Sequence, residues 1–467
     1  MKVALTIGDY LERGASVYPE RVAVVDEPDT PGSLGRVTYD ELHHRARGMA
    51  AALDAMGVPH GERVAIVSPN SARFLISFFG VSGSGRVLVP VNFRLNAEEV
   101  SYIVEHSGAS VLLVDPELEG ALAGVVAKER ILLDGSSDAG LFAPVAEGVE
   151  PRPWPEPDED ATCSINYTSG TTARPKGVQL THRNCWLNAA VFGWHAAVSD
   201  RDVYLHTLPM FHCNGWGMPY AVTAMGCPQV VQRKVDGETI LSRIEAEGVT
   251  LLCGAPAVVA AILDAAAARR QRGQEVPGRE HVRMIVAGAA PPTKTIERVE
   301  TELGWEFIQI YGLTETAPLL VMNRARPEWD GFDPGERARL LGRAGAPAVG
   351  VKMAVDSQGE VLTRTNHVFA GYWRQPQQTA EAIRDGWFHT GDGGYLDGPF
   401  TVIADRRKDV IITGGENVSS IEVEDCLFQH PAVAEAAAIG VPDERWGETV
   451  KALVVLRPGT AATEAEL

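Results

Sequence analysis

The sequence predicts an α/β protein, and two observations carry this prediction. Short apolar runs alternate with helical patterns through most of the 467 residues, which is typical of largely parallel sheets covered by helices on both faces. From about Gly342 the pattern changes to short strands, which predicts a small β-rich subdomain. Length alone predicts about two to four domains or subdomains.

The first part of the chain shows this alternation clearly. Thr38 and Glu41 have the spacing of a capping box, so we expect a helix that runs to Met56 and ends at Gly57. The other elements predicted here are helices at 7–18, 72–80 and 97–106, and strands at 21–26, 63–67, 87–91 and 110–114.

The segment 150–160 is rich in proline and acidic residues and is predicted to be a connector. Beyond it we expect the strand–helix alternation to resume. The predicted elements are a helix at 184–197 and strands at 163–167, 203–208, 251–256, 284–290 and 307–311.

Composition excludes several classes of protein. Hydrophobic residues make up 45% and charged residues 22% of the chain, as in soluble globular proteins. No apolar run approaches the ~18 residues of a membrane span, the N-terminus does not resemble a secretory signal, and the six cysteines have no metal-ligand spacing. We therefore expect a cytoplasmic protein. The formal net charge of −19 and the absence of a basic stripe argue against nucleic acid as a partner.

The stretch 167–177, YTSGTTARPKG, is the most informative part of the chain. Glycines let the backbone approach a ligand, successive amides can form an anion nest, and the hydroxyls and Lys176 add donors and charge. The order differs from a Walker A motif, because Lys176 precedes Gly177. An ordinary surface turn is the alternative, but a loop that holds a polyphosphate explains the composition better.

Two further motifs contain a carboxylate at or near their end. Tyr311-Gly312-Leu313-Thr314-Glu315-Thr316 follows a predicted strand, at the sheet edge where α/β proteins bind ligands. Glu315 is a candidate Mg²⁺ ligand, and the alternative is that this segment caps a helix. In 387–392, WFHTGD, Asp392 follows a glycine, and the alternative there is a plain turn residue.

Two more segments add histidine and basic residues. The stretch 209–220, PMFHCNGWGMPY, contains His212 and Trp216, although a lone histidine is more often structural than functional. The run DRRKD at 405–409 is followed by GGENV at 414–418, and a solvated charge run is the alternative for it.

Taken in order, these motifs resemble the signatures of the adenylate-forming superfamily, from near Val22 to the end, with the stretch 209–220 most similar to fatty acyl-CoA synthetases. The resemblance implies a large N-terminal domain at 1–404 and a small mobile α+β domain that starts at 405 and is incomplete within these 467 residues, with Lys408 as its hinge. The implied nucleotide-binding residues are Thr168, Ser169, Gly170, Thr171, Thr172, Lys176, Gly288, Ala289, Ala290, Tyr311, Gly312, Thr316, Asp392 and Arg406.

The same resemblance implies further roles. Asp392 would accept both ribose hydroxyls, Arg406 would contact the nucleotide, and Trp216 would line the entrance of an acyl tunnel. The implied catalytic residues are Lys176, His212, Thr314, Glu315 and Arg406, the metal ligands Thr171 and Glu315, and the acyl-substrate residues His212, Trp216, Gly288 and Gly312.

The function implied is ATP- and Mg²⁺-dependent activation of a carboxylic acid, fatty or aryl, to acyl-AMP, followed by thioester formation with coenzyme A. A homodimer is compatible with the sequence. One alternative is a related enzyme that passes the activated group to an amine, or acts on nitrite, without coenzyme A. Another is a catalytically silent nucleotide-binding protein. Family members continue beyond Leu467 to a Gly-Lys turn, and Lys451, the last lysine here, does not fit that motif.

Overall fold

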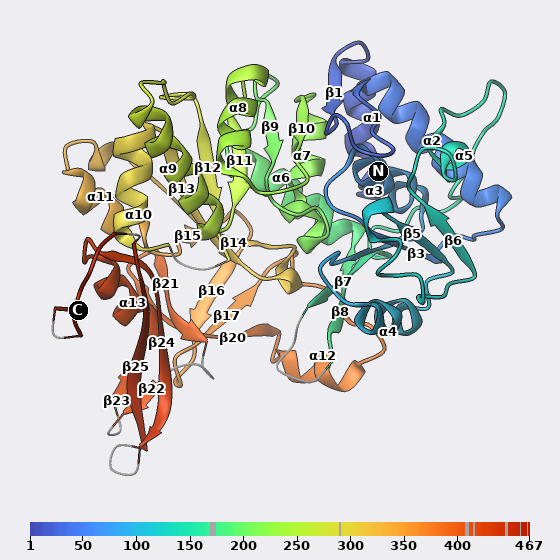
Figure 1. Ribbon diagram of the computed structural model, residues 1–467. Coiled ribbons are helices and arrows are strands. Elements are labelled where there is room, and N and C mark those ends of the chain that lie inside the picture. Colours follow the sequence, from blue (N-terminus) through green and yellow to red (C-terminus); the bar gives the residue numbers. More distant parts are fainter. Residues whose placement is uncertain are drawn as a thin grey trace. The chain divides into compact units, whose positions relative to one another are not determined.

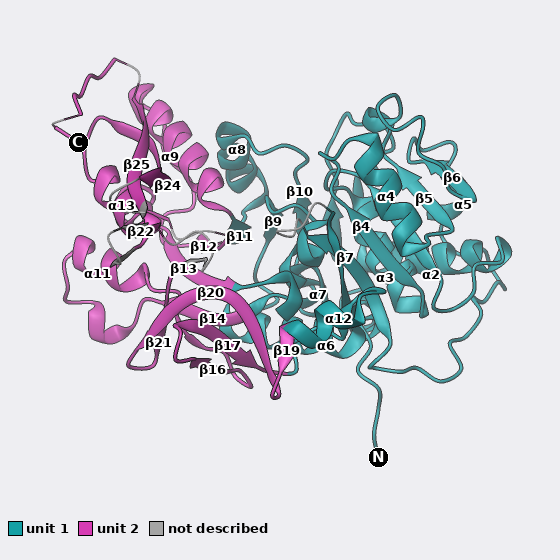
Figure 2. Cartoon of the chain, turned by 90° about the horizontal axis from the view of Figure 1, so that it is seen from below, with its two compact units in different colours: residues 1–254, 312–319, 366–381 teal, residues 255–311, 320–365, 382–467 magenta. Residues whose placement is uncertain are grey.

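The computed structural model describes residues 1–168, 174–288, 291–406, 411–413, 416–443, 447–457, 459–464 and 466–467. The chain packs as two compact units, coloured separately in Figure 2. Unit 1 comprises residues 1–254, 312–319 and 366–381, and unit 2 comprises residues 255–311, 320–365 and 382–467. This division does not bear on the predicted boundary after residue 404, and the predicted hinge Lys408 lies outside the described residues. Both stay predictions.

A seven-stranded sheet forms the centre of unit 1, in the order β18-β8-β7-β4-β3-β5-β6 (Figure 1). Neighbours from β7 to β6 are parallel, whereas β8 is antiparallel to both β7 and β18. All residues of β4 and β5 are buried, as expected for parallel strands covered on both faces. The strands are β3 (Arg63–Val67), β4 (Val87–Val91), β5 (Val111–Val114), β6 (Glu129–Leu132), β7 (Thr162–Thr168), β8 (Lys176–Thr181) and β18 (Gly371–Tyr372).

Capped helices cover this sheet. The predicted capping box is confirmed, because Thr38 and Glu41 exchange side-chain and backbone hydrogen bonds at the start of α2 (Tyr39–Ala55). Helix α4 (Ala97–Ser107) buries Ile103 and its neighbours against the apolar strands of the sheet. Other helices of unit 1 are α1 (Gly8–Val17), α3 (Ala72–Gly80), α5 (Ala139–Phe142), α6 (His182–His195), α7 (Met218–Ala224), α8 (Gly237–Glu247) and α12 (Pro376–Ala382).

Five more strands of unit 1 lie in the order β11-β9-β10-β1-β2. All neighbours in this series are parallel except β1 and β2, which are antiparallel. The strands are β1 (Val22–Val25), β2 (Arg36–Thr38), β9 (Tyr204–His206), β10 (Gln229–Val231) and β11 (Leu251–Gly254).

Unit 2 begins as a continuation of the α/β pattern. β12 and β13 are parallel, and β14 and β15 follow them in the same series. The elements are α9 (Pro256–Gln271), β12 (Arg283–Val286), α10 (Thr293–Arg298), β13 (Glu306–Gly312), β14 (Leu319–Arg324), α11 (Pro334–Leu341) and β15 (Ala346–Pro347).

The predicted change to short strands is confirmed in the remainder of unit 2. One antiparallel sheet contains β16 (Lys352–Val355), β17 (Glu360–Arg364), β19 (Ile383–Arg384), β20 (Trp387–Asp397) and β21 (Phe400–Arg406). A second contains β22 (Ile411–Thr413), β23 (Glu416–Val418), β24 (Val433–Asp443) and β25 (Gly447–Leu456), with α13 (Ser420–Phe428) packed on β24.

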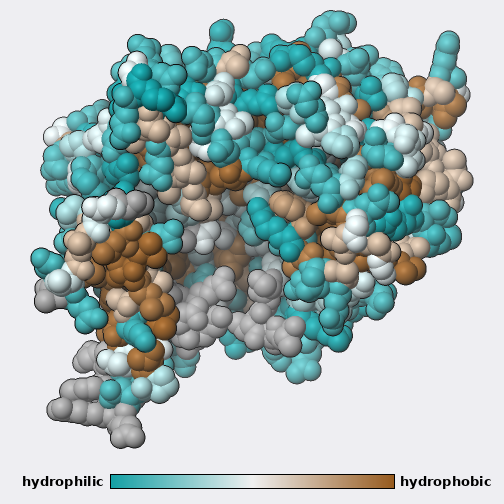
Figure 3. All heavy atoms as spheres, in the orientation of Figure 1, coloured by the Kyte–Doolittle hydropathy of each residue, from teal (hydrophilic) through white to brown (hydrophobic). Residues whose placement is uncertain are grey.

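The hairpin of β24 and β25 leaves an apolar face uncovered. Ile439, Leu453 and Val455 are 44%, 50% and 54% exposed, and Figure 3 shows apolar atoms gathered over this part of unit 2. Their register places the three side chains on the same face of the hairpin. No helix among the described residues is both long and apolar enough to cross a bilayer.

The mixed α/β architecture is therefore confirmed, with two local corrections. The predicted loop ends sooner than expected, because Lys176 and Gly177 already belong to β8 and pair with Thr168 and Tyr167 of β7. The helix predicted to begin at residue 184 begins at His182, because the Thr181 side chain caps it.

Candidate active site

The predicted phosphate loop connects two antiparallel strands. The Cα atoms of Thr168 and Lys176 are partners in the β7–β8 ladder, so these two residues flank the loop where it leaves the sheet. Gly177 is needed here, because a Cβ at this position would lie 2.9 Å from Ile165 Cγ2. The predicted ligands Ser169, Gly170, Thr171 and Thr172 lie outside the described residues.

A tyrosine that the sequence analysis missed connects two of the predicted residues. The Tyr372 hydroxyl donates a hydrogen bond to Glu315 Oε1 at 2.8 Å. Lys176 Nζ lies 4.7 Å from the centroid of the same tyrosine ring, a cation–π distance. In unit 1, therefore, Lys176 and the predicted metal ligand Glu315 both contact the side chain of Tyr372.

The Thr314–Thr316 turn, labelled η5, places Glu315 directly after β13. Thr316 is fully buried and its hydroxyl donates to the Pro318 carbonyl at 2.6 Å. Gly312 is required for this close packing, because a Cβ would lie 1.7 Å from the same carbonyl oxygen. Thr314 is also buried, whereas Glu315 is only partly buried.

The predicted substrate segment forms an unusual turn, labelled η3 (His212–Gly217). Cys213, Asn214 and Trp216 all have positive φ, a conformation that costs a non-glycine residue roughly 1–2 kcal/mol. Asn214 is held by two buried residues of β7, since Asn166 donates to its Oδ1 at 3.1 Å and its Nδ2 donates to the Ser164 hydroxyl at 2.8 Å. The β7 strand therefore positions both the phosphate loop and the substrate segment.

Trp216 does not lie open at a tunnel mouth in this structure, since it is only 4% exposed. Its carbonyl accepts a hydrogen bond from Asn188 Nδ2 at 3.1 Å, and Asn188 Oδ1 accepts one from the Leu319 amide at 3.0 Å. Asn188 is fully buried on α6 and so connects the substrate segment to the chain after η5.

Asn188→Ala should lower the free energy of unfolding by about 2–6 kcal/mol, because two buried backbone groups lose their partners at roughly 1–3 kcal/mol each. Urea denaturation followed by tryptophan fluorescence measures the change. Asn92→Ala is a matched control, because the Asn92 side chain accepts a bond from the backbone amide of Arg94, which is exposed. Equal stabilities of the two variants would contradict the role given to Asn188.

His212 is the first residue of this turn and is accessible to solvent. Phe211 packs edge-on against Phe93 with ring centroids 5.6 Å apart, which surrounds the segment with apolar groups. Partial desolvation by nearby protein atoms lowers the pKa of His212. The imidazole is therefore neutral at pH 7 and can accept or donate one hydrogen bond without adding charge.

Unit 2 holds the other predicted residues. The Tyr311 hydroxyl donates to Asp392 Oδ2 at 2.6 Å, and Asp392 is 7% exposed. Asp392 is also the ladder partner of Arg406 in the β20–β21 hairpin. Gly288 lies after β12 with a φ of 95°, which favours glycine, while Ala289 and Ala290 lie outside the described residues.

Glu360, another residue that the sequence analysis missed, organises the turn before Asp392. Its Oε1 accepts a hydrogen bond from the Gly391 amide at 3.0 Å, and its Oε2 lies 3.1 Å from His389 Nδ1. Asp356 is close to both side chains, but Arg384 already contacts His389 at 2.7 Å. This cluster is best explained as an ion-pair network that shapes the turn.

Unit 1 also contains a cavity of about 420 Å³ beside the substrate segment, bordered by Phe93 and Pro209. Gln232 lines it and is 4% exposed, and its Oε1 has no hydrogen-bond partner in the described part of the chain. The cations at its walls are Arg94, Lys234 and Arg233, of which Arg233 is paired with Asp115 at 2.9 Å.

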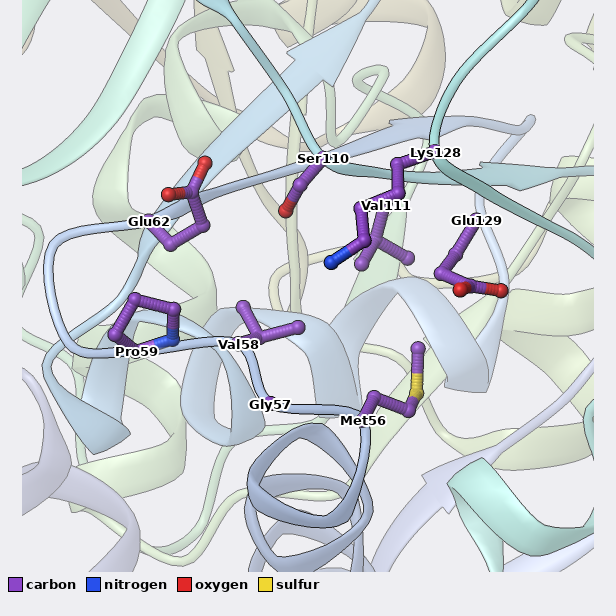
Figure 4. A pocket seen from close by; sticks show the side chains of 9 residues that line it. All are labelled: Met56, Gly57, Val58, Pro59, Glu62, Ser110, Val111, Lys128 and Glu129. Carbon is purple, nitrogen blue, oxygen red and sulfur yellow. The ribbon is translucent and has the colours of Figure 1, made fainter.

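A second cavity, of about 60 Å³, is too small for a substrate. Figure 4 shows Met56, Ser110 and Lys128 around it, with Glu62 and Glu129 at its sides. Its volume is that of about two water molecules.

Comparison with known proteins identifies the family to which the chain is similar. Residues 11–373 match the family described as AMP-binding enzyme, and residues 422–467 match the AMP-binding enzyme C-terminal domain. The chain is 36% identical over 488 residues to 4-hydroxybutyrate–CoA ligase 2 of Metallosphaera sedula, covering 98% of this chain and 86% of that protein. It is 35% identical over 502 residues to a peroxisomal acetate/butyrate–CoA ligase of Arabidopsis thaliana, covering 97% and 85% of the two chains.

Solved structures of coenzyme A ligases have the same fold as this chain. O-succinylbenzoate coenzyme A synthetase from Bacillus subtilis, in complex with ATP and magnesium ion, superposes with a TM-score of 0.80 at 28% identity, covering 98% of this chain and 91% of that one. The same enzyme with its acyl-adenylate intermediate gives a TM-score of 0.81 at 29% identity, covering 97% and 89%. The chain therefore belongs to the AMP-binding enzyme family and is an AMP-forming acid–thiol ligase.

Proposed function

We propose that this ligase activates a short aliphatic carboxylic acid with ATP and transfers the acyl group to coenzyme A. In the first step a carboxylate oxygen bonds to the α-phosphorus of ATP and pyrophosphate leaves. In the second, the thiol sulfur of coenzyme A bonds to the acyl carbon and AMP leaves. The observation that carries the proposal is the contact of Lys176 and Glu315 with the same Tyr372 ring and hydroxyl.

Lys176 and Glu315 are proposed to manage the charge of the first step. Lys176 supplies a fixed positive charge for the phosphates, and catalysis of phosphoryl and adenylyl transfer depends largely on such positioning and charge neutralisation. His212 is neutral at pH 7, so it would lie beside the carboxylate of the acid substrate without forming an ion pair with it. Thr168 ends β7 beside the phosphate loop, and Thr314 and Thr316 flank Glu315 in η5.

The residues present also fit a magnesium ion. Glu315 offers a carboxylate whose orientation is set by the Tyr372 hydroxyl, and carboxylate oxygens are preferred ligands of this hard cation. Glu315 would hold the metal, and Thr171 is proposed as a second ligand. When bound, the ion would supply charge neutralisation for the phosphate oxygens.

Asp392 is proposed to bind the ribose hydroxyls, with Arg406 as a second nucleotide contact and Lys408 as the hinge of the small domain. The Tyr311 hydroxyl holds Asp392 Oδ2 at 2.6 Å. Gly288, Ala289, Ala290 and Gly312 are proposed to border the adenine and the acyl group.

The burial of Trp216, which is 4% exposed, supports the proposal of a short acyl chain, because an indole packed at the acyl site would leave little room for a long one. The two curated relatives named above are ligases of 4-hydroxybutyrate and of acetate or butyrate. This proposal narrows the expectation of a fatty or aryl acid to the small aliphatic acids.

Trp216→Ala should shift specificity toward longer acids. We expect the ratio of kcat/KM for octanoate to that for butyrate to rise about tenfold or more, because each methylene buried in the freed space is worth about 0.8 kcal/mol. Trp216→Phe is the matched control, since it keeps most of the bulk. A chain-length profile that does not change in Trp216→Ala would remove this residue from the acyl site.

Coenzyme A is proposed to approach through the cavity of about 420 Å³ in unit 1. Arg94 and Lys234 are exposed cations at its walls and suit the phosphates of the coenzyme. The unpartnered Gln232 Oε1 can accept a bond from an amide N–H of the pantetheine arm. A cytosolic location and a homodimer remain parts of the proposal that depend on the sequence alone.

Pyrophosphate release from ATP is the test of the proposed function. The full-length protein is given acetate, butyrate, 4-hydroxybutyrate, octanoate, benzoate and amino acids, each with and without coenzyme A. Release with a short acid, and a coenzyme A thioester as product, supports the proposal. Release that ignores coenzyme A indicates transfer to an amine or nitrite chemistry, and no release with any acid indicates a nucleotide-binding protein without catalysis.

A further inference from the structure

A segment that is distant in sequence lies along the strand that follows the phosphate loop. Residues 366–373 reach β8, where β18 pairs with it and the Trp373 amide donates to the Gly177 carbonyl at 2.7 Å. At the other end of the segment, Asn184 Nδ2 donates to the Asn366 carbonyl at 2.8 Å. Both ends of the segment are therefore anchored on the chain that leads away from the loop.

Because the segment is held at both ends, the side chain of Tyr372 lies against Glu315 and Lys176. It is 9% exposed, its hydroxyl donates to Glu315 Oε1 at 2.8 Å, and its ring carries Lys176 Nζ at 4.7 Å from the centroid. The hydroxyl and the ring of this one tyrosine therefore contact a predicted metal carboxylate and a predicted phosphate-binding cation.

We propose that Tyr372 is a positioning residue for metal-bound ATP, because it orients the Glu315 carboxylate through its hydroxyl and the Lys176 ammonium through its ring. The inference rests on the proposed function, in which Glu315 holds the metal and Lys176 faces the phosphates. A carboxylate on a flexible side chain loses rotamer freedom when it binds a cation, and a bond that fixes it beforehand lowers this cost. Tyr372 touches neither reacting atom and acts through its two neighbours.

The experiment is a double-mutant cycle of Tyr372→Phe and Glu315→Gln. Phenylalanine keeps the ring beneath Lys176 and removes only the hydroxyl. The dissociation constant of ATP is measured by calorimetry in excess Mg²⁺ and again in EDTA, which requires no catalysis. In the wild-type background, Tyr372→Phe should weaken binding of ATP in Mg²⁺ about tenfold, as expected for one hydrogen bond to a charged group, and leave binding in EDTA unchanged.

In the Glu315→Gln background, Tyr372→Phe should have little further effect on ATP binding in Mg²⁺, because the carboxylate through which Tyr372 acts is absent. Tyr39→Phe is the control for general loss of stability. Tyr39 is fully buried and its hydroxyl donates to the Cys227 carbonyl at 2.8 Å, so the same chemical change is made away from the predicted residues. Tyr39→Phe should bind ATP as the wild type does in both solutions.

Three outcomes would overturn the inference. In the first, Tyr372→Phe binds ATP in Mg²⁺ as tightly as the wild type while Glu315→Gln binds it clearly more weakly. This result would exclude Tyr372 as a positioning residue but would still support Glu315 as the metal ligand. Effects that multiply in the double variant would show that the two residues act independently. Unchanged binding by Glu315→Gln itself would reject the metal site of the proposed function, and the inference with it.

Discussion

Asp392→Asn is expected to reduce kcat/KM for ATP by about 100-fold or more, with little change in the fold. Asparagine keeps the size of the side chain but removes the charge, and it offers one acceptor oxygen where the carboxylate offers two. Each hydrogen bond to a charged group contributes about 1.5–3 kcal/mol, and two ribose hydroxyls would be affected. Steady-state pyrophosphate release at varied ATP measures the change.

A carboxylate further along the same strand supplies the control for Asp392→Asn. Asp397 ends β20 and pairs with Arg343 at 2.9 Å, and its side chain is 57% exposed. Asp397→Asn should keep wild-type kinetics. Wild-type use of ATP by Asp392→Asn would contradict the ribose assignment, whereas equal loss in both variants would indicate a general effect of charge in unit 2.

Glu315→Gln is expected to lower kcat for pyrophosphate release by about 1000-fold at 1 mM Mg²⁺, since a metal contributes several kcal/mol of charge stabilisation. Glutamine preserves the acceptor for the Tyr372 hydroxyl, so the turn of residues 314–316 should stay intact. Higher Mg²⁺ should restore part of the activity. The measurement is a Mg²⁺ titration of pyrophosphate release at saturating ATP and acid.

The matched control is Glu159→Gln, which also removes one carboxylate charge from unit 1, here a buried one. Glu159 accepts bonds from the Leu5 amide at 3.1 Å and from Arg183 at 2.7 Å, and both contacts are structural. Its variant should lose stability and keep the Mg²⁺ dependence of the wild type. A Glu315→Gln protein with unaltered Mg²⁺ dependence would exclude Glu315 as the metal ligand.

Elements with strong local patterns could be predicted from the sequence to the residue. The strand at 63–67 and the helix at 72–80 are mostly apolar runs between turn signals, and both have the predicted bounds. The capping box of Thr38 and Glu41 depends only on a spacing of three residues. Such features are decided by neighbours in the sequence, which is why sequence reasoning finds them.

Parts of the site depend on contacts that have no local signature. Tyr372 lies in a strand of two residues whose existence depends on pairing with β8. The left-handed conformation of Cys213 and Asn214 is maintained by bonds from β7, and the sequence signals only the two glycines nearby. The burial of Trp216 likewise depends on Asn188, far away in the chain.

Strand β18 is synthesised long after its partner β8, and this order affects how the protein folds during synthesis. The chain leaves the ribosome from its N-terminus, so β8 at residues 176–181 emerges long before residues 371–372, which pair with it. Until then the outer edge of β8 has unpaired backbone groups, and such edges recruit other strands. Nascent chains that stall between these points should depend on chaperones, and they should consume no ATP because the proposed ribose-binding residue Asp392 has not yet been made either. Completion of this sheet edge therefore waits until residues 371–372 have been made, long after β8.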